Sequence, residues 1–217
     1  MSIKQNLERL KSTIPSGVEL VVVSKRQPKE SVLEAYEVGQ RIFGENRHKE
    51  LIDKYDNLPK DIEWHFIGSL QRTNVKYVVP RVALIHSVDS DKLLEEINKV
   101  AAQNSKVMDV LLEVHLAQES TKSGWDVDEL VVYLASQAHL SYSNVRVCGL
   151  MAMATYTSNS EIVEGEFKQL KTIYDKIKSL YFEADDSFNI VSAGMSSDYE
   201  LAIKHGANMV RIGSLLF

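Results

Sequence analysis

A single (β/α)8 barrel of the TIM type is the fold class that this sequence of 217 residues predicts. Short apolar runs rich in β-branched residues alternate with helical patterns along the whole chain, and eight such runs are present. Most of them are continuously apolar, which is typical of parallel strands buried on both faces. In chain order the predicted strands are residues 19–24, 41–44, 64–68, 84–87, 110–116, 145–151, 189–193 and 209–213.

The main alternative is an open doubly wound sheet. That fold would need more protection of its sheet edges than these strands provide. Because no linker, repeat or low-complexity tract interrupts the pattern, one domain over residues 1–217 is expected.

Helix signals fill the segments between the predicted strands. Apolar residues share one helical face in two of them: Leu93, Leu94, Ile97, Val100 and Ala101 in one, and Val163, Phe167, Leu170, Tyr174, Ile177 and Tyr181 in the other. Pro28 suits the first turn of a helix that ends at Gly39. Ser197 and Glu200 predict a capping box for a helix that stops at Gly206.

The chain stops at Phe217, directly after the eighth predicted strand, so no eighth helix follows it. An amphipathic opening segment is expected to pack in that place. Its apolar face consists of Ile3, Leu7, Leu10 and Ile14.

Composition and net charge exclude several classes of function. The net charge of −5 and a pI near 5.7 remove the usual electrostatic case for binding nucleic acid or an anionic membrane. A single cysteine, Cys148, forms no intrachain disulfide and fits a reducing compartment. No apolar run approaches the roughly 20 residues that span a bilayer, and the polar N-terminus is unlike a signal peptide. A soluble cytoplasmic protein is expected.

Functional groups of such a barrel collect where strands end. Polar or special residues end nearly every predicted strand: Lys25, Glu45 with Asn46, Gly68 with Ser69, His86 with Ser87, Glu113 with His115, Met151 with Met153, Ser192 with Gly194, and Arg211 with Gly213. Lys25 has two interpretations. It is a solvated lysine after a strand, or an amine whose pKa partial burial and nearby cations lower, which makes it a Schiff-base nucleophile.

The last two strand ends predict a phosphate site. Residues 192–198 form a strand end, a glycine turn at Gly194 and a helix start, where backbone N–H groups favour an anion. An ordinary capped turn is the alternative. Arg211, Gly213 and Ser214 follow on the last strand, and barrels commonly bind phosphate between the loops after strands seven and eight.

No metal site is expected, because the six histidines lack metal-ligand spacing. Cys148 is expected to be a small buried residue. Met151 and Met153 fit core or rim packing, although one methionine could line a ligand ring.

These strand ends resemble a pyridoxal phosphate barrel. More specifically, the chain resembles the pyridoxal phosphate homeostasis protein family (YggS/PROSC type), which is similar to the N-terminal barrel of alanine racemase. The matching stretches run in order along almost the whole chain: Val23-Ser24-Lys25, Phe43-Gly44-Glu45-Asn46, Trp64-His65-Phe66-Ile67-Gly68, Ile85-His86-Ser87-Val88-Asp89-Ser90, Lys122-Ser123-Gly124, Gly149-Leu150-Met151-Ala152-Met153, Gly194-Met195-Ser196, Asp198-Tyr199-Glu200 and Met209-Val210-Arg211-Ile212-Gly213.

The resemblance implies roles for these residues. Lys25 would form the internal aldimine with pyridoxal 5′-phosphate. Asn46 would lie near the ring oxygen and Arg211 would face the pyridine nitrogen, although Arg211 could instead end the strand and pair with a surface carboxylate. The residues implied at the phosphate are Ser192 and the backbone of Gly213 and Ser214, helped by Ser196, with Gly194 in the turn.

The sequence departs from the family in three places. Thr73-Asn74 stands near where the family usually has Asn-Lys. Ala193 replaces a usual methionine, and the chain ends where a glycine normally follows Phe217.

Two functions compete, and both use the same cofactor. A racemase requires an acid/base group on each face of the cofactor, and alanine-racemase-type enzymes take the second from an additional β domain. With all 217 residues assigned to the barrel, a non-catalytic protein is expected, one that holds and releases the cofactor for apo-enzymes. The missing dimerisation domain favours a monomer. A barrel for another sugar or nucleotide phosphate is a third class.

Overall fold

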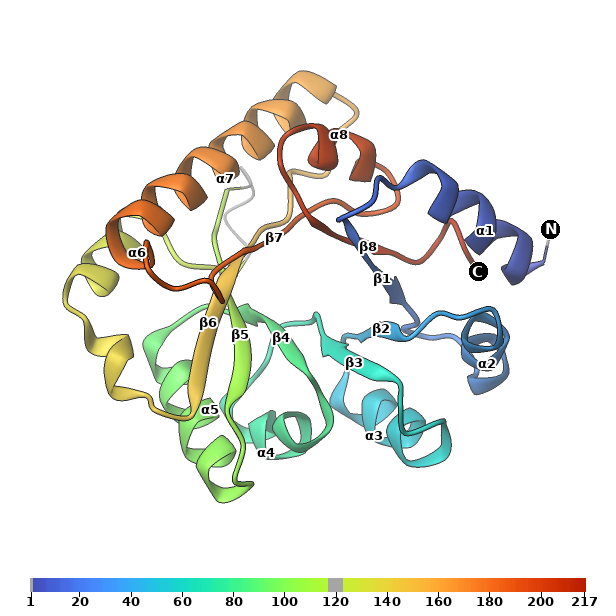
Figure 1. The fold of residues 1–217 in the computed structure, drawn as a ribbon, viewed down its shortest axis with the longest axis horizontal. Helices are drawn as coiled ribbons and strands as arrows, with labels where there is room; N and C mark the ends of the chain where they lie inside the picture. The colour runs from blue at the N-terminus through green and yellow to red at the C-terminus, as the bar shows by residue number, and fades with distance from the viewer. Residues whose placement is uncertain (1, 117–122) are drawn as a thin grey trace.

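The computed structural model describes residues 2–116 and 123–217, in which eight parallel strands close into a barrel in the order β1 to β8 (Figure 1). β1 pairs with β8 in the register Glu19 to Met209 and Val22 to Ile212, and this pairing closes the sheet. The predicted barrel is therefore confirmed, and the open doubly wound alternative is wrong.

All eight predicted strands are present, most within two residues of the expected bounds. The strands are β1 Glu19–Val23, β2 Ile42–Glu45, β3 Glu63–Phe66, β4 Leu84–Val88, β5 Met108–Glu113, β6 Val145–Met151, β7 Ile190–Ser192 and β8 Met209–Ile212. The α-helices are α1 Ile3–Thr13, α2 Lys29–Glu37, α3 His48–Asn57, α4 Val75–Val78, α5 Asp91–Gln103, α6 Val127–Ala135, α7 Ser160–Tyr181 and α8 Tyr199–Lys204.

Alternate strand residues face two separate cores. The larger core lies between the sheet and the helices and includes the predicted apolar faces of α5 and α7. A smaller cluster fills the barrel interior: Val21, Leu84, Leu111, Cys148, Met151 and Met209. Since strand residues alternate in direction, His86, Glu113 and Arg211, two positions beyond Leu84, Leu111 and Met209, also face inward, toward the mouth.

The helix ends discussed above lie where the sequence predicts them, with one exception. α2 begins after Pro28 and stops before Gly39, which has φ 90°. Gly206, at φ 94°, follows α8 as predicted. The predicted capping box at Ser197 is wrong, because Asp198 is the N-cap residue and its carboxylate accepts from the backbone N–H of Met195 at 2.6 Å.

α1 takes the place of a helix after β8, as expected. Leu7 and Leu10 are buried. Asn6 donates from Nδ2 to the carbonyl oxygen of Leu216 at 3.0 Å, and Thr13 Oγ1 contacts the Tyr199 hydroxyl of α8 at 3.0 Å. The two chain termini therefore lie near each other (Figure 1).

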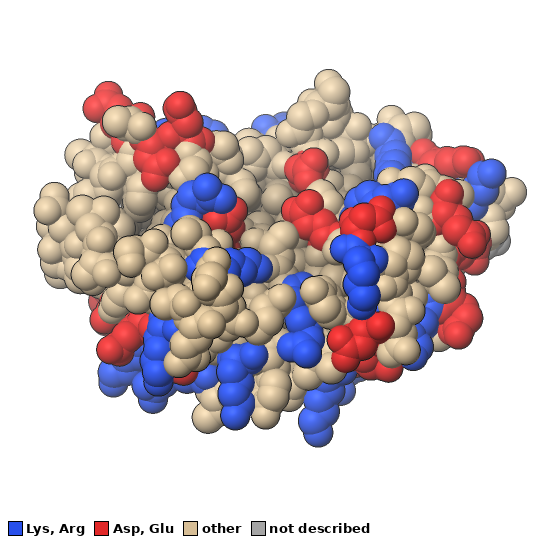
Figure 2. Space-filling model, turned by 60° about the horizontal axis from the view of Figure 1, so that its bottom comes forward, with Lys and Arg blue, Asp and Glu red and all other residues tan. Residues whose placement is uncertain are grey.

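The charged surface is mixed. On the face in Figure 2, acidic and basic side chains are interspersed, and lysines and arginines gather toward its lower rim. None of the described helices is both long enough and apolar enough to cross a membrane.

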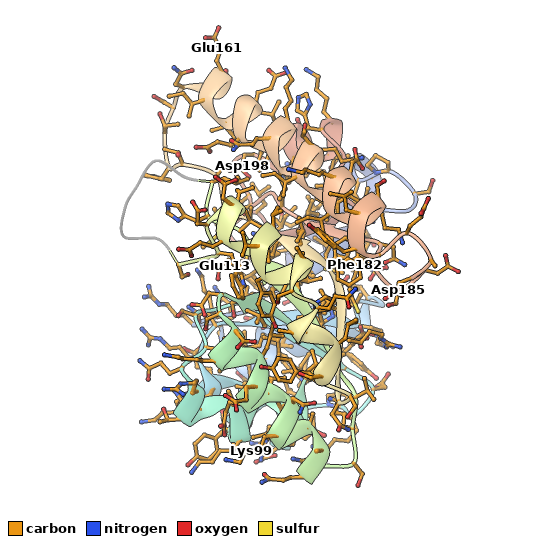
Figure 3. All side chains as sticks on the ribbon, turned by 90° about the vertical axis from the view of Figure 1, so that its left-hand side faces the viewer. Lys99, Glu113, Glu161, Phe182, Asp185 and Asp198 are labelled. Carbon is orange, nitrogen blue, oxygen red and sulfur yellow. The ribbon has the colours of Figure 1, made fainter. Side chains whose placement is uncertain are left out.

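Strand direction separates the two ends of the barrel. In Figure 3, Glu113 at the end of β5 and Asp198 after β7 lie left of centre, on the side of the mouth. Phe182 and Asp185, which precede β7, lie on the opposite side.

Candidate functional site

Lys25 lies in a tight turn directly after β1. Ser24 is buried, whereas Lys25 is exposed, so the partial burial expected for its amine is not present. The next residue, Arg26, has φ 63°, a left-handed conformation that is strained for a residue with a side chain. Its backbone N–H donates to Glu50 Oε2 of α3 at 2.7 Å, and this bond stabilises the turn.

A buried ion pair supports this turn from below. Lys54 of α3 donates from Nζ to Glu45 Oε1 at 2.6 Å and to the carbonyl oxygen of Ser24 at 2.7 Å. The Ser24 hydroxyl also donates to Glu45 Oε1, at 2.7 Å. Burial raises the pKa of Glu45, although Lys54 and Ser24 oppose that shift. Glu45 Oε2 is buried without a hydrogen-bond partner among the described residues.

Arg211 is buried at the mouth, with only 4% of its surface exposed. Its Nη1 donates to Ser192 Oγ at 2.5 Å and its Nη2 donates to the carbonyl oxygen of Ala152 at 3.1 Å. The alternative in which Arg211 pairs with a surface carboxylate is therefore wrong. Burial lowers the pKa of Arg211 to about 10, opposed by the charges of Glu113 and Asp198, and the guanidinium stays cationic at neutral pH.

Two buried histidines continue from Ser192 through the barrel interior. His86 Nδ1 lies 3.0 Å from Ser192 Oγ, and His86 Nε2 lies 3.0 Å from His65 Nδ1. His65 Nε2 lies 3.2 Å from Oε1 of Glu63, the first residue of β3. Burial, with the charges of His65 and Arg211, lowers the pKa of His86 well below its ordinary value, so His86 is neutral.

The loops after β7 and β8 meet as the sequence predicts. The Gly213 backbone N–H donates to Ser196 Oγ at 3.3 Å. Gly194 has φ 92°, and a Cβ there would lie 2.8 Å from Tyr199 Cα. A Cβ on Gly213 would lie 2.8 Å from the carbonyl oxygen of Val23, so β1 and this loop are in direct contact. Ser214 is exposed at the same edge, whereas Ser192 is fully buried and its hydroxyl already has two partners.

Asn46 lies at the end of β2, where a Cβ on Gly68 would approach its carbonyl oxygen to 2.4 Å. Its Oδ1 is buried without a partner among the described residues. Met151 is buried in the interior cluster, beneath the mouth. The mouth thus presents an unpartnered amide oxygen, a hydroxyl next to a backbone N–H, and a guanidinium that uses two of its five N–H donors. This set of one acceptor and several donors fits a ligand with a phosphate and a polar aromatic ring.

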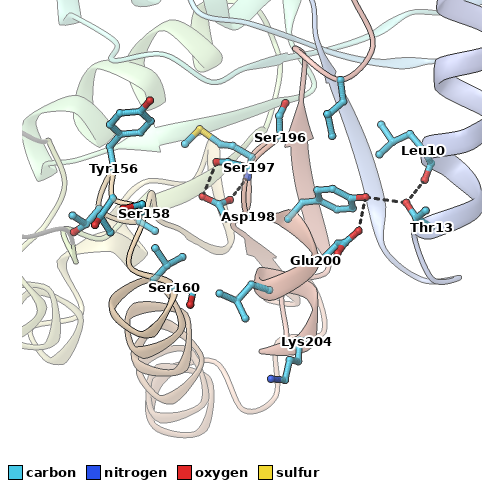
Figure 4. Close-up of a pocket in the computed structure, with 18 of the residues that line it drawn as sticks. Leu10, Thr13, Tyr156, Ser158, Ser160, Ser196, Ser197, Asp198, Glu200 and Lys204 are labelled. Carbon is cyan, nitrogen blue, oxygen red and sulfur yellow. Dashed lines mark hydrogen bonds between the residues drawn. The ribbon is translucent and has the colours of Figure 1, made fainter. Parts of the chain in front are cut away.

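A cavity of about 1210 Å³ opens beside the mouth, between α1, α8 and the start of α7 (Figure 4). It shares Ser196 with the loop after β7, but Lys25, Ser192 and Arg211 do not line it. Within residues 2–116 and 123–217, no three His, Cys, Asp or Glu side chains are grouped to hold a metal ion. Lys122 of the Lys122-Ser123-Gly124 stretch lies outside the described residues.

Sequence reasoning missed the roles of Lys54 and of the pair formed by His65 and His86. The signal for the histidines was present, since Glu63 and His65 alternate along one strand and Leu84 and His86 along the next, which turns both imidazoles inward. Lys54 gave no such signal, because its contact with Glu45 depends on how α3 packs.

The fold and the mouth define a barrel of the alanine racemase N-terminal type, and the family model "Alanine racemase, N-terminal domain" matches residues 1–217. Against "Pyridoxal phosphate homeostasis protein" of Aquifex aeolicus (strain VF5), the chain is 42% identical over 200 residues, 92% of this chain and 86% of that protein. The chain belongs to the pyridoxal phosphate homeostasis protein family, which confirms the resemblance noted from its motifs.

Solved structures of related proteins have the same fold. PipY of Synechococcus elongatus PCC7942 superimposes with a TM-score of 0.94 at 33% identity without PLP, and with 0.89 at 34% with PLP bound, each over all of both chains. Alanine racemase of Clostridium difficile 630 shares the fold, with a TM-score of 0.81, at 16% identity over 59% of its length.

Proposed function

We propose that this protein binds pyridoxal 5′-phosphate at the mouth of the barrel, covalently through Lys25, and holds and releases it for apo-enzymes as a cytoplasmic monomer. The contact between Gly213 and Val23 carries the proposal, because it brings the turn of Lys25 next to the loops that suit a phosphate. The relative PipY, solved with PLP bound, supports the same ligand.

Pyridoxal phosphate supplies an aldehyde carbon, a dianionic phosphate and a pyridine nitrogen. The Lys25 amine would bond to the aldehyde carbon with loss of the aldehyde oxygen as water, and hydrolysis would reverse the bond; Lys25 is exposed to that water. Ser196 with the backbone of Gly213 and Ser214 holds the phosphate, and Gly194 gives the loop its turn. Asn46 would contact the ring oxygen, Met151 would line the ring, and Arg211, fixed by Ser192, would donate to the ring nitrogen.

Borohydride reduction of the loaded protein, followed by peptide mass analysis, tests the covalent site. The reduced adduct is expected on Lys25. An adduct on Lys29 or Lys122 would disprove the assignment. Lys25→Ala should abolish the covalent absorption band and keep weaker non-covalent binding, whereas the control Lys29→Ala should retain the band.

A racemase is the second candidate, because the barrel also resembles alanine racemase in fold. The cationic Arg211 would make the bound ring a weaker electron acceptor, and a direct assay of proton exchange separates the two candidates. A guanidinium only donates hydrogen bonds, so it keeps the pyridine nitrogen unprotonated and a poor acceptor of electrons. We expect no substantial exchange of the α-proton of alanine or serine in deuterium oxide. Turnover of about 1 per second or faster, within the ordinary range of enzymes, would contradict the non-catalytic proposal.

A further inference from the structure

A single chain of side-chain hydrogen bonds crosses the barrel interior from its N-terminal end to the mouth. It runs through Glu63, His65, His86, Ser192 and Arg211, with four successive contacts of 3.2, 3.0, 3.0 and 2.5 Å. The three middle side chains are almost completely buried, and Glu63 is half exposed. Such a chain is costly to bury unless every member has its partner.

The two ends of the chain determine where its protons lie. A guanidinium only donates and a carboxylate only accepts. Arg211 therefore donates to Ser192 Oγ, and Glu63 accepts from His65 Nε2. A neutral imidazole protonated at Nε2 accepts at Nδ1, so His86 must donate from Nε2 to His65 Nδ1. His86 Nδ1 then accepts the hydroxyl proton of Ser192.

A positive charge on the histidine pair would reverse these bonds. On His86 that charge would lie one hydroxyl away from the Arg211 guanidinium, in a site that burial already makes unfavourable for a second cation. The other charged groups that act on Arg211 are Glu113 of β5 and Asp198 of the loop before α8, and both favour the cation at Arg211 itself. With His86 neutral, the one-directional arrangement gives every side chain of the chain a hydrogen-bond partner.

Ser192 has only one proton, and in this arrangement it points to His86. Ser192 therefore cannot donate to the phosphate at the same time. Its oxygen instead accepts from Nη1 of Arg211, while the carbonyl oxygen of Ala152 accepts from Nη2, and the two bonds fix the orientation of the guanidinium. The remaining N–H donors of the guanidinium are left for a ligand.

We propose that Glu63, His65, His86 and Ser192 are positioning residues for Arg211: their one-directional chain holds the guanidinium toward the ring nitrogen of the bound cofactor and keeps the Ser192 proton away from the phosphate. This inference rests on the proposed function. It also replaces the expected direct contact between Ser192 and the phosphate with an indirect role through Arg211.

Histidine side-chain nitrogen NMR tests the direction of the chain, first on the protein without cofactor. Both His65 and His86 are expected to carry their proton on Nε2, before and after pyridoxal phosphate is added. Glu63→Gln, whose amide can donate as well as accept, should let His65 populate the other tautomer, whereas Glu19→Gln at the same end of the barrel should not. A proton on His86 Nδ1 in the wild type would overturn the inference.

A second experiment tests positioning, with the ring nitrogen of labelled pyridoxal phosphate as the probe. His86→Leu should shift the ring nitrogen signal and weaken binding about tenfold, within the range for losing a supporting partner of a ligand-binding residue. His86→Asn, which keeps an acceptor for Ser192, should restore both. Wild-type values in His86→Leu would overturn the inference. A wild-type protein with the expected tautomers that binds no pyridoxal phosphate would instead overturn the proposed function.

Discussion

Lys54 Nζ lies 2.6 Å from Glu45 Oε1, in an ion pair whose side chains are 5% and 0% exposed. The same ammonium group bonds the carbonyl oxygen of Ser24, the residue before Lys25. Lys54 thus supports the turn that contains Lys25, the lysine that we propose bonds the cofactor.

Lys54→Met should destabilise the protein by about 3–5 kcal/mol, because it leaves the Glu45 carboxylate buried without a counter-ion. Adding Glu45→Gln should restore most of the loss, since no buried charge then remains. Urea unfolding measures both variants. The control is Lys29→Met, which breaks the exposed 3.1 Å pair with Asp53 and should cost at most about 1 kcal/mol. Equal losses for Lys54→Met and Lys29→Met would contradict this account.

Substitutions in the loops after β7 and β8 should weaken the binding of pyridoxal phosphate. Ser196→Ala should remove the hydrogen bond that we propose Ser196 makes with the charged phosphate, worth about 1.5–3 kcal/mol or roughly tenfold to a hundredfold in affinity. Gly213→Val should weaken pyridoxal phosphate binding further, because its Cβ would press on the Val23 carbonyl oxygen. Fluorescence titration measures both dissociation constants, and near-UV circular dichroism checks the fold.

Gly165→Ala is the matched control for the loop variants. A Cβ at Gly165 of α7 meets no atom within 4 Å, so the affinity should not change. Wild-type dissociation constants in both Ser196→Ala and Gly213→Val would place the phosphate elsewhere.

The sequence predicts the barrel well because strands buried on both faces leave continuous apolar runs, as at β1 and β6. It also predicts which strand ends meet, since the topology brings the ends of β7, β8 and β1 together. It does not predict side-chain partners across the closed barrel. The role of Ser192 at the phosphate stays a prediction, whereas its bonds to Arg211 and His86, which come from other strands, could not be predicted from the sequence. The predicted capping box at Ser197 is wrong because Asp198 is the N-cap residue and its carboxylate binds the backbone of Met195.

Glu113 should make stability fall as pH rises. Burial raises its pKa, with a further contribution from Asp89, while Ser123, Arg211 and His115 oppose the shift. A carboxyl with a raised folded-state pKa stabilises the fold fully below its unfolded value of about 4.3, and loses that contribution as pH rises through the folded-state value.

Glu113→Gln removes this titration and keeps an acceptor for the Ser123 hydroxyl, which lies 3.0 Å from Glu113 Oε1. The variant should match the wild type near pH 4 and become increasingly more stable than it toward pH 7. Urea unfolding across this range measures the difference. A gap that is constant with pH, or that has the opposite sign at pH 7, would contradict the assignment.

Arg211→Glu should change the protonation of the bound ring. In the wild type the guanidinium is cationic at neutral pH, so in the proposed site it would donate to the pyridine nitrogen, which would then stay unprotonated. A carboxylate at the same place would accept instead and favour the pyridinium. Nitrogen NMR of ring-labelled pyridoxal phosphate should show an unprotonated nitrogen in the wild type and a shift toward the protonated form in Arg211→Glu. Arg211→Gln, which adds no buried charge, should keep the nitrogen unprotonated and shows whether loss of the cation alone matters. A pyridinium signal in the wild type would mean that Arg211 does not face the ring nitrogen.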